Sequence, residues 1–200
     1  MRENLFAYGS LSDGQIHFPR ISALIETRKE AFVKGSMLRL RCGYPALISP
    51  GEESQWIRGE ILELKSSDVL WPILDTLMGY DPLKPEKSFF LRTKLNIQGG
   101  DGSTQIGQAY FLNPKKIKKG FAPIADGDWM KNLQKTPPVI HQLQPRHRDY
   151  IRKLSNCRGR DIVPIKLDLY RELLSMEMIV DKGRRLALTP LGQEVSLFLQ

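Results

Sequence analysis

The sequence has few of the residues that build metal centres and disulfide frameworks. Its 200 residues include two cysteines, Cys42 and Cys157, and three histidines. The cysteines lie far apart and lack the spacing of metal ligands, so we expect two reduced thiols and no metal site. No cofactor is predicted.

Long hydrophobic runs are also missing. No stretch of about 18 apolar residues occurs, which excludes a membrane-spanning helix, and no membrane partner is expected. The apolar run after residue 4 ends before Gly9 and is too short for the apolar core of a signal peptide. The expected location is the cytoplasm.

The composition is that of an ordinary globular chain, with 41% hydrophobic and 26% charged residues. The net charge is +8, and residues 83–120 carry eight basic and two acidic side chains, including four lysines between Lys115 and Lys119. This cluster has two interpretations, a solvated basic face or a surface for a polyanion.

The first 130 residues alternate short strand patterns with few helices. Residues 56–64 alternate apolar and polar side chains, which is typical of a half-buried strand. Residues 66–80 have apolar side chains at helical spacing, with Ser66 or Ser67 as the N-cap and Gly79 as the stop. Further strands are predicted over 5–8, 29–40, 43–51, 89–97 and 105–112. The fold class is therefore α+β with a mixed or antiparallel sheet.

Between Asn113 and Pro145 the composition changes to lysines, polar residues and two adjacent prolines, and we place a linker over 132–145. Beyond it, helices are predicted around 150–154, 161–165 and 167–174, followed by a hairpin and a last helix capped by Thr189. This order resembles a winged-helix domain over residues 146–200. So small a domain buries little core by itself.

The motif Tyr8-Gly9-Ser10-Leu11, directly after an apolar strand, resembles the opening of the gamma-glutamylcyclotransferase family. Three more landmarks follow in the family's order: Pro45-Ala46-Leu47 with Gly59-Glu60, Leu74-Asp75 with Gly79-Tyr80 and Phe90-Leu91-Arg92, and Ile124 to Trp129. The resemblance covers residues 1–131 and implies a mixed-sheet or barrel fold.

The resemblance also implies a reaction, in which the α-amine of a γ-glutamyl amide attacks its own γ-carbonyl and releases 5-oxoproline. The expected partner is a small γ-glutamyl or amino-acid-like ligand, gripped by the loop from Tyr8 to Leu11. With no His or Lys in the motif, Ser10 is interpreted as a hydrogen-bonding residue and not as a nucleophile. Tyr44, Met78 and Phe90 are the other expected pocket residues.

The family carries out its proton transfers with a glutamate at the end of the central helix. Here that position holds Met78, whose thioether transfers no proton, and Phe90 stands where many relatives have tyrosine. One hypothesis is a ligand-binding or sensing domain that lacks the usual chemistry. The other is an active cyclotransferase in which Asp75 or Glu86 substitutes as the acid.

For the C-terminal domain, either DNA or a protein is the expected partner. As a DNA reader, its third helix would present Lys166 and Arg171, with Arg184 and Arg185 on the wing contacting phosphates. Acidic residues on the same helix favour the alternative, a helical interaction or dimerisation module.

Overall fold

The computed structural model describes residues 3–51, 54–157 and 161–200. By its internal contacts the chain divides into an N-terminal unit, Met1–Thr136, and a C-terminal unit, Pro137–Gln200. The boundary falls inside the segment predicted as a linker. That segment contains regular structure, namely the end of one helix and a short 3-10 turn.

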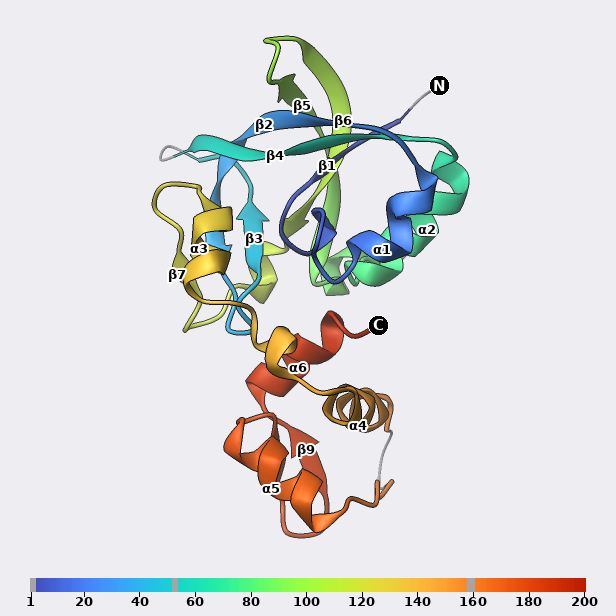
Figure 1. Ribbon diagram of the computed structural model, residues 1–200, viewed down its shortest axis with the longest axis vertical. Helices are drawn as coiled ribbons and strands as arrows, with labels where there is room; N and C mark the ends of the chain where they lie inside the picture. The colour runs from blue at the N-terminus through green and yellow to red at the C-terminus, as the bar shows by residue number, and fades with distance from the viewer. Residues whose placement is uncertain (1–2, 52–53, 158–160) are drawn as a thin grey trace. The chain divides into compact units, whose positions relative to one another are not determined.

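The N-terminal unit is a closed β-barrel of mixed strands (Figure 1). The strands β1, β4, β2, β3 and β6 pair in that order, and β6 returns to β1, which closes the ring. The β1–β6 and β3–β6 pairs are parallel and the others antiparallel. The strands are β1 (Asn4–Ala7), β2 (Ile25–Arg39), β3 (Pro45–Ile48), β4 (Gln55–Leu64), β5 (Phe90–Gly99), β6 (Thr104–Leu112) and β7 (Ala122–Pro123). The predicted α+β class with a mixed sheet or barrel is confirmed.

Helices occupy the connections of the barrel. They are α1 (Phe18–Ile21), α2 (Ser67–Leu77) and α3 (Trp129–Lys135), with 3-10 turns η1 (Gly9–Leu11), η2 (Ser22–Leu24), η3 (Pro85–Lys87) and η4 (Pro114–Lys116). Ser66 takes the N-cap position of α2, although its side chain makes no capping hydrogen bond. Pro72 lies inside α2, beyond its first turn, and removes one hydrogen-bond donor from the helix.

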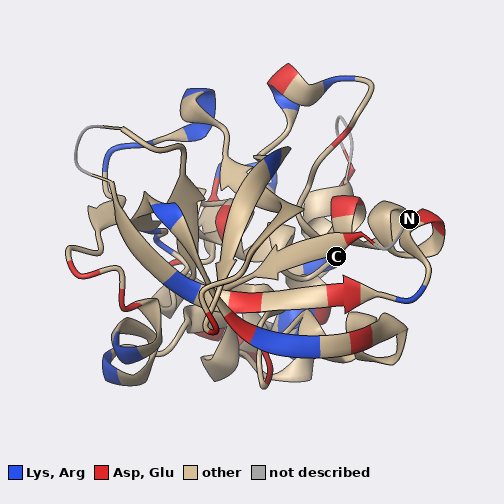
Figure 2. Cartoon of the chain, turned by 90° about the horizontal axis from the view of Figure 1, so that it is seen from above, with Lys and Arg blue, Asp and Glu red and all other residues tan. Residues whose placement is uncertain are grey.

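The neighbouring strands β2 and β4 carry both basic and acidic residues (Figure 2). Arg58 Nε lies 2.6 Å from a Glu30 carboxylate oxygen, and Arg28 Nε lies 3.2 Å from Glu60. These exposed pairs compensate one another across neighbouring strands, and each contributes little to stability.

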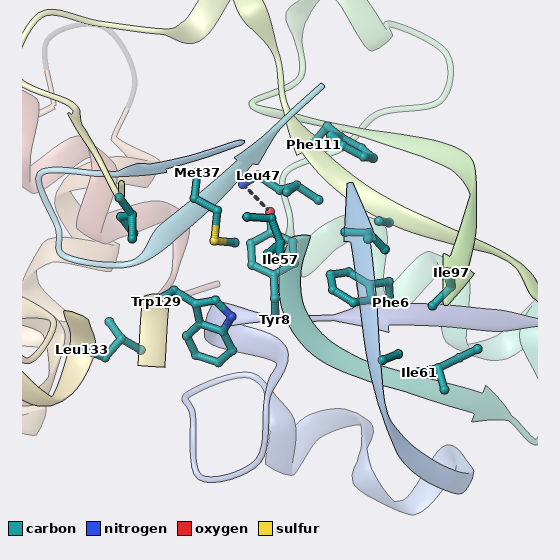
Figure 3. Packing of buried hydrophobic residues seen from close by; sticks show 14 residues of the cluster. Phe6, Tyr8, Met37, Leu47, Ile57, Ile61, Ile97, Phe111, Trp129 and Leu133 are labelled. Atoms are coloured by element: carbon teal, nitrogen blue, oxygen red, sulfur yellow. Dashed lines mark hydrogen bonds between the residues drawn. The ribbon is translucent and has the colours of Figure 1, made fainter. Parts of the chain in front are cut away.

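The barrel encloses a core of apolar side chains from every side of the ring (Figure 3). Phe6 and Ile57 are fully buried in it, and Trp129 from the start of α3 joins them and donates its indole N–H to the carbonyl of Arg58, 2.7 Å away. The remaining members are Tyr8, Ala31, Val33, Met37, Leu47, Ile61, Ile97, Ala109, Phe111, Ile124 and Leu133. The core therefore ties the barrel to the segment that follows it.

The C-terminal unit contains η5 (Val139–Gln142), α4 (Pro145–Asn156), α5 (Leu167–Ser175), the hairpin β8 (Ile179–Asp181) with β9 (Leu186–Leu188), and α6 (Pro190–Leu197). Thr189 caps α6 as predicted, accepting a hydrogen bond from the N–H of Gly192 at 3.0 Å. The prediction of a short helix over Asp161–Ile165 is wrong. Pro164 interrupts that segment, whose residues form no helix, and the carbonyl of Val163 accepts a hydrogen bond from the Tyr150 hydroxyl at 3.0 Å.

Candidate functional site

The loop after β1 is held in a tight turn. Gly9 has a φ of +57°, and a Cβ added there would lie 2.9 Å from the Pro45 ring, so the turn requires glycine. The N–H of Leu11 donates to the carbonyl of Tyr8 at 3.2 Å. The backbone N–H of Leu11, in the loop that is expected to grip the ligand, is thus used inside the turn.

The Tyr8 side chain points into the barrel core (Figure 3). Its hydroxyl accepts a hydrogen bond from the N–H of Leu47 at 3.0 Å and donates to the carbonyl of Tyr110 at 2.7 Å. Burial raises the pKa of this phenol. The hydroxyl joins β3 to β6 next to the loop.

Ser10 is paired with a histidine that sequence reasoning missed. His17 Nδ1 lies 3.1 Å from Ser10 Oγ, and the His17 N–H donates to the Ser10 carbonyl at 3.0 Å. Both side chains are at least 96% buried. The pair fixes the orientation of the Ser10 hydroxyl. The only signal for it in the sequence was a histidine seven residues beyond the serine.

Helix α2 ends in a Schellman motif. Gly79 has a φ of +59°, its N–H donates to the carbonyl of Thr76, and the N–H of Tyr80 donates to the carbonyl of Asp75 at 2.8 Å. Met78 occupies the C-cap and is buried. The position where the family resemblance implies a glutamate is thus a buried thioether at a well-defined helix end.

Asp75 lies one turn earlier and is the centre of a polar network. The Tyr110 hydroxyl donates to its Oδ1 at 2.6 Å, and Arg92 Nε lies 3.5 Å from the same oxygen. Arg92 and Tyr110 are cross-strand neighbours on β5 and β6. Burial raises the pKa of Asp75, while the Tyr110 hydrogen bond and the Arg92 charge oppose that rise. The carboxyl therefore holds a proton more readily than an exposed aspartate.

The Arg92 guanidinium is enclosed by aromatic rings. Its central carbon lies 4.6 Å from the centre of the Trp71 ring and 5.6 Å from that of Tyr80. Its Nη1 is buried and has no hydrogen-bond partner among the described residues. The guanidinium thus has one buried nitrogen without a hydrogen-bond acceptor among the described residues.

The other predicted site residues have different environments. Glu86 is exposed on η3, so of the two candidate substitute acids only Asp75 has a buried setting. Tyr44 is fully buried just before β3, and Phe90 at the start of β5 packs edge-on against Phe89. Tyr110 connects the loop after β1 to the polar network around Asp75, because its carbonyl accepts a hydrogen bond from Tyr8 and its hydroxyl donates one to Asp75.

Across the described parts of the chain, no three His, Cys, Asp or Glu side chains gather in a way that would hold a metal ion. No helix in those parts is long and apolar enough to cross a membrane.

In the C-terminal unit, the acidic residues of α5 are paired with α4. Arg146 forms ion pairs with Asp168 at 3.1 Å and with Glu172 at 2.6 Å, and His147 Nε2 lies 2.7 Å from Glu172. The predicted DNA-contacting residues Lys166, Arg171, Arg184 and Arg185 are all exposed.

A closed mixed barrel, a glycine turn after its first strand and a glycine-ended helix beside it define a cyclotransferase-type barrel domain. The chain belongs to the family described as Gamma-glutamyl cyclotransferase, AIG2-like, whose model matches residues 5–131. No curated protein gave a match.

Solved structures share the fold at low sequence identity. YkqA from Bacillus subtilis superposes with a TM-score of 0.50 at 19% identity, and the match covers 68% of this chain and 42% of YkqA. The solution structure of At3g28950.1 from Arabidopsis thaliana has a TM-score of 0.50 at 15% identity, over 84% of this chain and 94% of that one. An aig2-like protein from Mus musculus has a TM-score of 0.44 at 21% identity, over 59% and 80%. This chain thus spans less than half the length of YkqA.

Proposed function

We propose that the N-terminal unit binds a γ-glutamyl or similar amino-acid-like ligand without turning it over as a cyclotransferase. The observation that carries the proposal is Met78, buried at the C-cap of α2. The loop around Ser10 and the polar network around Asp75 provide hydrogen-bonding groups, whereas the position that the family uses for proton transfer holds a thioether.

The missing group matters because of the proton balance of the reaction. The α-nitrogen of the substrate forms a bond to the γ-carbonyl carbon, and the bond from that carbon to the leaving nitrogen breaks. The attacking ammonium must first lose a proton, and the leaving amine must gain one. Without a carboxylate to carry that proton, holding the substrate in place gives binding without efficient turnover.

The experiment measures binding and turnover separately. Calorimetry with a γ-glutamyl amine reports binding, and quantification of 5-oxoproline reports turnover. We expect wild type to bind without releasing 5-oxoproline, and Met78→Glu to gain turnover. Ser10→Ala is expected to weaken binding. Clear turnover by the wild type would overturn the proposal.

A second candidate is an active cyclotransferase that uses Asp75, and the elevated pKa of this buried carboxyl favours it. In that case wild-type turnover would be abolished in Asp75→Asn and retained in Glu86→Gln, which removes an exposed carboxylate from the same unit. Turnover equally affected by both substitutions would refute a specific role for Asp75.

For the C-terminal unit we propose sequence-independent DNA contact through Lys166, Arg171, Arg184 and Arg185. The pairing of Asp168 and Glu172 with α4 supports it, because those two carboxylates are then partly compensated. A gel-shift titration at several salt concentrations tests it, with Arg171→Gln and Arg184→Gln each expected to reduce the salt slope by about one. Unchanged binding and slope would exclude this surface.

A further inference from the structure

Two turns of the N-terminal unit are fastened together by one buried side chain. Asn113 is 3% exposed, and its amide nitrogen lies 2.9 Å from the Ser88 carbonyl and 3.3 Å from that of Glu86. Its Oδ1 accepts from the N–H of Lys115 at 3.0 Å. The turns over residues 81–88 and 113–119 therefore meet at Asn113, at the end of the barrel where β5 begins and β6 ends (Figure 1).

The two turns carry six lysines, which we call the lysine face, together with two exposed carboxylates, Asp81 and Glu86. Among the described residues none of these lysines has an ion-pair partner, in contrast to the paired charges on β2 and β4. Five of them are exposed and one is half-buried. The lysine face consists of Lys84, Lys87, Lys115, Lys116, Lys118 and Lys119.

Apolar side chains project from the same turns. Leu83 is 88% exposed and Ile117 is 46% exposed. Each sits in a hydrogen-bonded turn, since the N–H of Leu83 donates to an Asp81 carboxylate oxygen at 2.9 Å and that of Ile117 to the Pro114 carbonyl at 3.3 Å. Both apolar side chains are therefore exposed on turns whose backbone is fixed by hydrogen bonds.

Lysines combined with exposed aliphatic side chains favour one class of anionic partner over another. Single-stranded nucleic acid is held by aromatic rings that stack on bases, and neither turn contains an aromatic residue. Lysines around exposed aliphatic side chains match the surface of an anionic bilayer, where ammonium groups meet headgroups and aliphatic groups enter the acyl boundary.

We propose that the lysine face binds the surface of anionic lipid bilayers, with Leu83 and Ile117 inserted at the boundary between headgroups and acyl chains. The sequence predicted no membrane partner because no segment spans a bilayer, but surface binding needs no spanning segment. This inference is independent of the chemistry at Asp75 and Met78.

The test is co-sedimentation of the full chain with vesicles of phosphatidylserine and phosphatidylcholine, and with phosphatidylcholine vesicles alone. We expect binding to the anionic vesicles only, weakened by salt. Each lysine near the surface contributes about fivefold, so Lys115→Gln with Lys118→Gln is expected to reduce partitioning roughly 25-fold. Lys29→Gln with Lys94→Gln removes the same charge from exposed strand positions of the same unit and is expected to change partitioning little.

The apolar contribution is measured with Leu83→Ser and Ile117→Ser together. We expect partitioning to fall about tenfold or more while its salt dependence stays the same, and the exposed pair Ile106→Ser with Met130→Ser serves as the control. The proposal is overturned if anionic vesicles are not bound at low salt, or if the control pairs weaken binding as much. Tighter binding to duplex DNA than to vesicles, lost with the lysines and unaffected by the serine pair, would assign the face to nucleic acid instead.

Discussion

The polar network around Asp75 predicts that Tyr110→Phe destabilises the N-terminal unit in a pH-dependent way. The substitution keeps the ring and removes the hydroxyl that donates to Asp75 Oδ1 at 2.6 Å. A hydrogen bond to a charged group contributes about 1.5–3 kcal/mol and one between neutral groups about 0.5–1.5 kcal/mol. The expected loss is therefore about 2 kcal/mol where Asp75 is ionised and about 1 kcal/mol where it is protonated.

The sign of the pH dependence follows from the pKa of Asp75. Burial raises that pKa in the folded state and the Tyr110 hydrogen bond lowers it, so removing the hydroxyl raises it further. When the pKa of a carboxyl is higher in the folded state than in the unfolded state, the free energy of unfolding falls as the pH rises above the unfolded-state pKa of about 3.9. The fall is complete once the pH exceeds the folded-state pKa. The free-energy loss in Tyr110→Phe thus increases from about pH 4 to neutral pH.

Tryptophan fluorescence during urea unfolding isolates the relevant unit, because all three tryptophans, Trp56, Trp71 and Trp129, belong to the N-terminal unit. A loss of about 2 kcal/mol shifts the urea midpoint by about 1 M. Tyr8→Phe is the matched control, since its hydroxyl bonds only to neutral backbone groups. The free energy of unfolding is expected to fall by the same amount in Tyr8→Phe at about pH 4 and at neutral pH. An equal loss at both pH values in Tyr110→Phe would refute the ionised Asp75 network.

Three further substitutions test other parts of the structure. Gly9→Ala places a methyl group in a left-handed turn 2.9 Å from Pro45, and the unfolding free energy by tryptophan fluorescence is expected to fall by about 1–3 kcal/mol; a fall below about 0.5 kcal/mol would contradict the turn. Thr189→Ala removes the bond from the Gly192 N–H and is expected to speed amide hydrogen exchange in α6 about fivefold, as a cap contributes about 1 kcal/mol; unchanged exchange would exclude the cap. Asp75→Asn removes the raised pKa, so its stability relative to the wild type is expected to rise from about pH 4 to neutral pH, and a constant difference would show that the carboxyl has an ordinary pKa.

The barrel strands were predictable because each is a local pattern. The alternation over residues 56–64 corresponds to β4, and the glycine-rich turn near residue 100 joins β5 to β6. The closure of the ring was not readable from such patterns. It depends on the parallel pairing of Leu5 with Gln108, two residues more than 100 positions apart, and only the family resemblance implied it.

The site was predictable only in part, for the same reason. The loop at Gly9 follows from the sequence motif, and the family resemblance alone implies a glutamate at the position of Met78. The pairing of His17 with Ser10 depends on how the irregular segment between β1 and α1 folds back, and the contact of Asp75 with Tyr110 requires α2 to lie against β6. In the C-terminal unit, the helix predicted over Asp161–Ile165 does not form, because Pro164 interrupts it.

The end of α2 explains how methionine can stand, without loss of the fold, where the family resemblance implies a glutamate. The Schellman motif at the end of α2 uses backbone groups and Gly79, so it places no demand on the Met78 side chain. The Asp75 carboxylate, in contrast, meets Tyr110 and Arg92 and connects the helix to two strands. The contacts of Asp75 within the fold therefore account for its burial, and its position is no evidence for catalysis. The two roles separate in Met78→Glu with Tyr110→Phe: if Asp75 only supports the fold, the double variant is less stable than Met78→Glu yet keeps its turnover at temperatures where it remains folded.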